Sequence, residues 1–169
     1  MANPSQDQVW AELEKNLFAV VGMVTAHQEA RTVGIVYIVR DRKLYFGTFK
    51  DTWKTRHITQ NGHISMTVPI AKRIPLMPWI KIPAATITFA AEARVLTNEQ
   101  ADPDVLKALY RDVAKDGQQM ARSCVIEVTP IDDFITYGVG VPLMQMRFPE
   151  KARGRVATAK HREAAQKTY

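Results

Sequence analysis

Residues 44–68 read LYFGTFKDTWKTRHITQNGHISMTV. The run begins in a strand pattern at 43–49, continues as a short helix over 52–60 and ends in a second strand at 63–68. A strand that leads directly into a helix start places free backbone N–H groups and the positive end of the helix dipole at the connection. The order of elements therefore predicts a place where an anion can bind.

The charges around the predicted helix start favour the same reading. Cations at a helix N-terminus are normally unfavourable by a few tenths to about 1 kcal/mol each. Lys50, Lys54 and Arg56 nevertheless gather here, with only Asp51 to offset them. A bound dianion would remove the conflict, with threonine hydroxyls and a lysine as donors. A solvated turn whose lysines point away is the alternative, and charge placement alone leaves both open.

The same stretch is similar to the core motif of the pyridoxamine 5′-phosphate oxidase-like FMN-binding split barrels. The residues that match this motif in register are Thr48, Thr52, Lys54, Ile58, Asn61 and Ser65. The resemblance implies that Thr48, Thr52 and Lys54 hold the FMN phosphate. The resemblance also implies that Gly47 and Trp53 bind the cofactor at the same place, between the strand and the helix.

The resemblance places the preceding strand, residues 31–36, along the isoalloxazine ring of the flavin. The cofactor-binding residues implied there are Arg31, Val33 and Val36. Two departures stand out: the family oxidase has Arg where this chain has Trp53, and a second phosphate-binding Lys near the place of Val36 or Tyr37. The oxidase's signature for pyridoxal phosphate is also missing near the C-terminus, so we do not expect pyridoxamine phosphate oxidation itself.

The rest of the chain predicts a mainly β fold with flanking helices, a six-stranded antiparallel split β-barrel of Greek-key type. The six strand patterns are 17–26, 32–40, 43–49, 63–68, 84–97 and 121–137. Helical patterns cover 6–15, 52–60 and 98–117. We expect one barrel domain over residues 1–150 and a basic, flexible tail over 151–169.

Local signals predict how several elements begin and end. Asp51 or Thr52 is placed to cap the 52–60 helix, and Asn98 the 98–117 helix. Asn61, followed by glycine, predicts a left-handed helix stop. Residues 41–42 predict a tight hairpin turn. Because they lack the Asn-Gly signal of a two-residue hairpin, the sequence does not specify the type of this turn.

Two further segments are interpreted from proline content. The four prolines of 69–83 predict a long loop or broken edge, in which Trp79 is expected to pack at an interface. Thr129-Pro130 predicts a bend in the last strand.

The composition narrows the function classes. With 169 residues, 46% of them hydrophobic, the chain fits one globular domain, and no apolar run approaches a membrane span. The polar start predicts a cytoplasmic protein. Cys124, the single cysteine, is expected to be a buried, inert thiol. The scattered histidines predict no metal site.

Three functions follow as hypotheses. The first is an FMN-dependent oxidoreductase with a small-molecule substrate and an electron donor, a homodimer with cofactor sites at its interface and no side chain named as catalyst. The second is a non-catalytic flavin-binding barrel, or a relative that binds F420 or haem. The third is a small basic barrel that binds nucleic acid through its tail, since the net charge is +6; the tail's lack of interleaved aromatics makes it the weakest.

Overall fold

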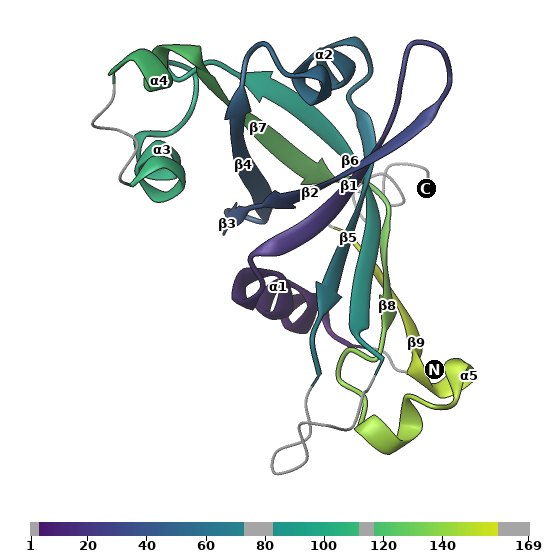
Figure 1. The fold of residues 1–169 in the computed structure, drawn as a ribbon. Helices are drawn as coiled ribbons and strands as arrows, with labels where there is room; N and C mark the ends of the chain where they lie inside the picture. Colours follow the sequence, from purple (N-terminus) through teal and green to yellow (C-terminus); the bar gives the residue numbers. More distant parts are fainter. Residues whose placement is uncertain (1–3, 73–82, 112–116, 159–169) are drawn as a thin grey trace, which may run out of the picture.

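The computed structural model describes residues 4–72, 83–111 and 117–158. In this part of the chain nine antiparallel strands form one sheet that curls into a barrel (Figure 1). The strands are β1 Phe18–Val24, β2 Ala30–Val36, β3 Ile38–Arg40, β4 Lys43–Phe49, β5 His63–Ile70, β6 Ala85–Leu96, β7 Ser123–Pro130, β8 Asp133–Tyr137 and β9 Arg153–Ala157. The helices are α1 Gln6–Lys15, α2 Trp53–Gln60, α3 Pro103–Tyr110, α4 Gly117–Arg122 and α5 Pro149–Ala152, and Leu143–Gln145 form a 3₁₀ turn, η2. No described helix reaches the length and hydrophobicity that a bilayer crossing requires.

A single bent segment closes the barrel. The strands neighbour one another in the order β2-β1-β5-β6-β7-β4-β3, and the two ends of this path, β2 and β3, are consecutive in the chain. They meet at Tyr37, which is buried and donates its hydroxyl hydrogen bond to the carbonyl oxygen of Leu13 at 2.8 Å. After β3, Asp41 and Arg42 both have positive φ, 49° and 56°. Two left-handed residues match the type I′ hairpin turn, which settles the turn type that the sequence left open.

The mainly β, antiparallel class is confirmed, but the expected number of six strands is wrong. The predicted 32–40 strand breaks at Tyr37 into β2 and β3, and the predicted 121–137 strand breaks after Pro130 into β7 and β8. β9 adds a strand inside the expected flexible tail, because Gly154 and Val156 alternate with exposed arginines and pair the segment with β8. Residues 159–169 lie outside the described part.

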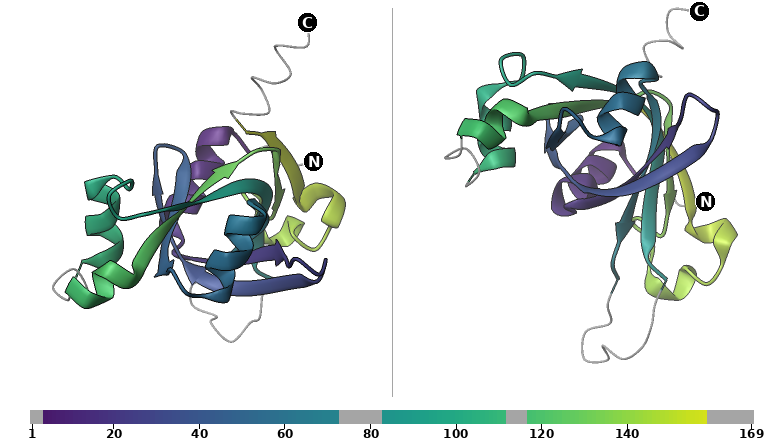
Figure 2. Two further views of the ribbon diagram at one scale, coloured as in Figure 1. Left: turned by 90° about the horizontal axis from the view of Figure 1, so that it is seen from above. Right: turned by 45° about the horizontal axis from the view of Figure 1, so that its top comes forward.

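Side chains from the inner face of the sheet and from α1 fill the barrel. Trp10 of α1 meets the ring of Phe134 edge-on at 5.5 Å, and Phe134 meets Phe89 at 5.2 Å. Ser5 and Gln8 form a capping box that fixes the start of α1. Seen from above, α2 lies across one end of the barrel, against β1 and β6 (Figure 2).

Several predicted boundaries differ from the structure. Thr52 caps α2 as expected, but Asn61 is extended, with φ −143°, so the left-handed stop is wrong. The predicted 98–117 helix begins only at Pro103, because Asp102 caps it by accepting from Asp104 N at 2.7 Å, while the Asn98 amide donates to the Met120 carbonyl oxygen.

The proline-rich segment also begins differently. Pro69 lies inside β5, opposite Thr86, so the strand runs two residues further than predicted. Residues 73–82, including Trp79, lie outside the described part.

Candidate functional site

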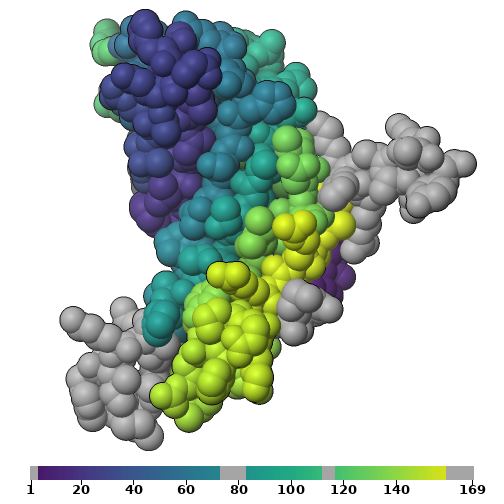
Figure 3. Space-filling model, turned by 90° about the vertical axis from the view of Figure 1, so that its right-hand side faces the viewer, coloured from purple at the N-terminus to yellow at the C-terminus, as the bar shows by residue number. Residues whose placement is uncertain are grey.

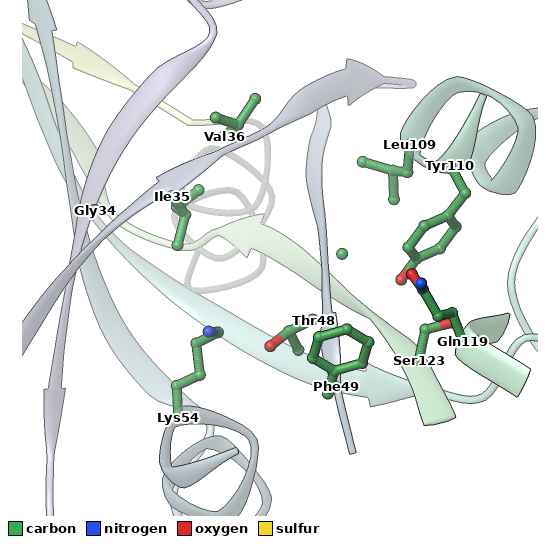
Figure 4. A pocket seen from close by; sticks show the side chains of 11 residues that line it. Gly34, Ile35, Val36, Thr48, Phe49, Lys54, Leu109, Tyr110, Gln119 and Ser123 are labelled. Atoms are coloured by element: carbon green, nitrogen blue, oxygen red, sulfur yellow. The ribbon is translucent and has the colours of Figure 1, made fainter. Parts of the chain in front are cut away.

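A cleft opens in the barrel wall between β2 and β4. β2 ends and β3 begins at the bend at Tyr37, and β3 pairs only with residues 43–45 of β4. Among the described strands, none pairs with the same edge of β4 from Phe46 to Phe49, while the other edge of β4 pairs with β7. The resulting cleft has a volume of about 430 Å³ (Figure 4). Its lining residues are Gly34, Ile35, Val36, Gly47, Thr48, Phe49, Lys54, Leu109, Tyr110, Gln119 and Ser123. This size lies within the range of small-molecule sites in proteins.

Three threonines shape the end of the cleft next to α2. The hydroxyls of Thr52 and Thr55 both donate to the carbonyl oxygen of Phe49, at 3.1 and 2.8 Å. Thr52 Oγ1 also accepts from the amide of Thr55 and lies 3.3 Å from Thr48 Oγ1. Because the protons of Thr52 and Thr55 go to the Phe49 carbonyl oxygen, the proton of Thr48 can go either to Thr52 Oγ1 or to a ligand, and Thr48 is the one of the three that lines the cleft.

Lys54 provides the positive charge at the same end. Its side chain rises from the first turn of α2 toward Ile35 and the hydroxyl of Thr48 (Figure 4). No acidic side chain among the described residues forms an ion pair with it. The amides of Trp53 and Lys54, the first two of the helix, have no acceptor within it. A hydroxyl, an ammonium group and a helix start therefore converge where an anion with several oxygens would be bound.

Tyr110 forms the opposite wall of the cleft, on the other side of β4. A Cβ added to Gly47 would lie 2.8 Å from the Tyr110 hydroxyl oxygen, so only glycine lets the ring lie against the strand. The hydroxyl donates to the carbonyl oxygen of Cys124 at 2.9 Å, and burial raises the pKa of Tyr110. Cys124 is buried as expected, and burial raises the pKa of its thiol. Both groups are therefore neutral near pH 7.

The loop between β4 and α2 is tied to the end of α4. Lys50 donates its amide to the Arg122 carbonyl oxygen at 2.9 Å and its Nζ to the Ala121 carbonyl oxygen at 2.8 Å. The Arg122 guanidinium lies 3.0 Å from an Asp51 carboxylate oxygen and 5.9 Å from the ring centroid of Phe49. These contacts hold the two sides of the cleft in one arrangement.

Half of the predicted cofactor residues line this cleft: Val36, Gly47, Thr48 and Lys54. Thr52 stands directly behind Thr48. The other three predicted residues, Arg31, Val33 and Trp53, are not part of the lining.

Their positions explain why. The Arg31 side chain reaches Glu29 at 3.6 Å near the tip of the β1–β2 hairpin, and Val33 packs partly buried against the hydrophobic core. Trp53 meets the ring of His57 on α2. Their predicted role in cofactor binding stays a prediction.

The sequence analysis missed the residues that line the cleft from distant parts of the chain. Leu109, Tyr110, Gln119 and Ser123 reach it from α3, α4 and β7. Leu109 and Tyr110 are apolar residues at helical spacing within the predicted 98–117 helix, which is the signal of any packed helix. In the described ranges no three metal-ligating side chains cluster.

An uncharged sheet face adjoins the cleft. The outward side chains of β1 are Phe18, Val20, Gly22 and Val24; those of β5 from Ser65 to Pro69 are Ser, Thr and Pro, and those of β6 from Thr86 to Ala90 are Thr, Thr and Ala. Figure 3 shows this side of the molecule, from the purple and blue β1–β2 hairpin through teal β5 and β6 to green β8 and yellow β9. Val36, opposite Phe18 and 67% exposed, belongs both to this face and to the cleft lining.

The fold is shared with known structures. An FMN-binding protein from Nostoc punctiforme, described as pyridoxamine 5′-phosphate oxidase-related, is 12% identical, with a TM-score of 0.55, over 80% of this chain and 84% of its own. A FAD-binding protein from Mesorhizobium loti is 12% identical, with a TM-score of 0.57, over 75% and 88%. An F420 reductase is 14% identical, with a TM-score of 0.52, over 77% and 95%.

At these identities the likeness shows the fold. The chain has the split barrel of the pyridoxamine 5′-phosphate oxidase-related proteins, as the resemblance in residues 44–68 implied. No sequence-family model matches the chain, and no curated protein matches it in sequence.

Proposed function

We propose that this chain is a flavin-dependent oxidoreductase that binds FMN in the cleft between β2 and β4. The observation that supports this most directly is that Lys54, from the first turn of α2, and the Thr48 hydroxyl, from the end of β4, line the same end of the cleft. This polar end opens into a cleft whose remaining walls include Ile35, Val36 and Leu109. A ligand with a dianionic tail and a flat, apolar ring system fits a cleft that has one cationic end and apolar walls.

The donors present suit a phosphate. Thr48 offers a hydroxyl, Lys54 an ammonium group without an acidic partner in the described chain, and the start of α2 two amides. Lys50, Lys54 and Arg122 against Asp51 leave a local charge of +2, which a phosphate dianion balances.

In this proposal the protein binds and orients, and the cofactor performs the redox chemistry. Bound FMN supplies hydride or electron transfer between a donor and a small-molecule substrate. Residues 34–36 of β2 form the wall beside the ring, and the buried Tyr110 closes the far side against water. No side chain of the chain is assigned a proton transfer.

We further propose a homodimer in which the uncharged sheet face is the interface. A face three strands wide without charge is unusual on an isolated surface and typical of the centre of an interface. Val36 lies on that face and in the cleft, so a second copy that covers the face also covers the cleft. Each cofactor would then be enclosed by residues of both chains.

The test is to load the purified protein with FMN, remove the excess and record its spectrum. We expect about one FMN per chain and an absorbance band at about 450 nm. Bleaching by NADH or NADPH, with recovery in air, supports the oxidoreductase, whereas a stable yellow protein supports a non-catalytic flavin protein. A colourless protein after loading contradicts FMN binding.

A deazaflavin is the second candidate, because an F420 reductase shares this fold. F420 also carries a phosphate, as a singly charged diester, so the same corner could hold it with one charge fewer to balance. Loading with F420 in parallel distinguishes the two, since the cofactor that binds at lower concentration is the one the cleft fits.

A further inference from the structure

We infer that the end of the cleft formed by α3 and α4 binds an uncharged, flat ligand with a carbonyl or amide group. This inference rests on the proposed flavin binding and names the class of molecule that would meet the cofactor. Figure 4 shows the two ends: Lys54 and Ile35 lie on one side of β4, and Leu109, Tyr110, Gln119 and Ser123 on the other.

There is room for a second molecule beside a cofactor. A hollow of about 440 Å³ adjoins the cleft and shares two lining residues with it, Phe49 and Gln119. The Phe49 ring is 44% exposed at this junction, so a planar ligand can stack on it or on the edge of Tyr110. The ties from Lys50 and Arg122 fix the position of α4, so this wall exists before a ligand arrives.

The charges at this end favour a neutral ligand. Among the cleft-lining residues, only Lys54 carries a formal charge, and the proposed phosphate uses it. Tyr110 is neutral and its hydroxyl is bonded to a carbonyl oxygen. Arg122 borders the adjoining hollow, but Asp51 lies 3.0 Å from its guanidinium and would repel a carboxylate placed there. A carboxylate buried at this end would lack a free cation and lose its hydration.

A side-chain amide can recognise the polar edge of such a ligand. Gln119 lines both the cleft and the hollow, and its amide has two N–H donors and an oxygen with two acceptor positions, so it can bond a carbonyl or carboxamide in addition to the interaction it already makes. The ligand class is therefore an uncharged ring compound with one such group.

The experiment compares naphthalene carboxamide with naphthalene carboxylate, which share a ring system and differ in charge. Each is titrated into the FMN-loaded protein, and binding is followed by calorimetry and by the flavin absorbance. We expect the carboxamide to bind at least about tenfold more tightly than the carboxylate. Tighter binding of the carboxylate, lost in Arg122→Gln, would show an acid-binding site and overturn the inference.

Two tryptophan variants of α3 locate the binding. Leu109→Trp fills the cleft end and is expected to weaken the carboxamide by about tenfold or more, measured on protein that is saturated with FMN. Lys107→Trp, an exposed position on the same helix outside the cleft lining, should leave the carboxamide affinity unchanged. Unchanged carboxamide affinity in Leu109→Trp, or no binding to the FMN-loaded protein, refutes this inference alone, whereas failure to bind FMN refutes the proposed function and the inference together.

Discussion

Replacing Lys54 by alanine should separate the binding of FMN from that of riboflavin. Riboflavin has the same ring system and side chain but no phosphate, so the difference between the two affinities measures what the protein contributes to the phosphate. In the structure Lys54 lines the cleft beside Thr48 and has no acidic partner among the described residues. Lys54→Ala therefore removes a charge whose assigned partner is the ligand.

The expected size follows from the contact. A hydrogen bond to a charged group contributes about 1.5–3 kcal/mol, and about 1.4 kcal/mol corresponds to a tenfold change in Kd. The side chain is only partly buried, so water screens part of the interaction and the lower half of that range applies. We expect Lys54→Ala to weaken FMN by about 10- to 30-fold and riboflavin by less than about twofold.

The assay is the quenching of flavin fluorescence on titration with the protein, at two salt concentrations. Arg56→Ala is the matched control, because Arg56 is an exposed cation on the same helix and outside the cleft lining. The FMN affinity of the wild type should fall with salt more steeply than that of Lys54→Ala. Equal losses for FMN and riboflavin, or an Arg56→Ala effect as large as that of Lys54→Ala, would refute the phosphate site at this corner.

Three further predictions concern stability and assembly. Gly47→Ala should lower the free energy of unfolding in urea by about 1–3 kcal/mol, because the new Cβ would meet the Tyr110 hydroxyl; no loss would contradict the packing. Burial and the Glu127 carboxylate raise the pKa of Tyr45 to about 12, so its contribution to stability is complete below pH 10 and is lost as pH rises toward 12. Tyr45→Phe should make the melting temperature fall less steeply between pH 10 and 12 than it does in the wild type. An unchanged slope would contradict the raised pKa of Tyr45. Val20→Glu, in the middle of the uncharged face, should convert dimer to monomer in sedimentation and weaken FMN, and a dimer that persists would exclude this face as the interface.

The parts of the fold that are local in sequence were predictable. Residues close in sequence specify the N-caps of α1 and α2, at Ser5 and Thr52, and the strand–helix–strand run over 44–68. The helices α1 and α2 form where the hydrophobic patterns placed them. The break at Tyr37 was not predictable, because each half of the bent strand keeps its own β pattern and only the pairing partners change. Thr129-Pro130 did indicate a bend, but no local pattern reported that the residues after it form a separate strand paired with β9.

The candidate site divides in the same way. Thr48 and Lys54 lie close in sequence to the turn that brings them together, so the motif indicated them. Tyr110 and Ser123 reach the cleft because β4 pairs with β7 and α3 packs beside them, which no local pattern reports. Arg31 was implied as a cofactor residue by the family resemblance, but it lies near the hairpin tip, away from the cleft.

The bend at Tyr37 links the cleft to a helix that does not line it. The β2 wall of the cleft ends at this residue, and the β4 wall is connected to it through β3; the Tyr37 hydroxyl is anchored to a backbone oxygen near the end of α1. The spacing between the walls thus depends on how firmly the N-terminal helix is seated in the barrel. Substitutions of residues that pack against α1, far from any bound molecule, should change the spacing between β2 and β4 before they disrupt the rest of the sheet.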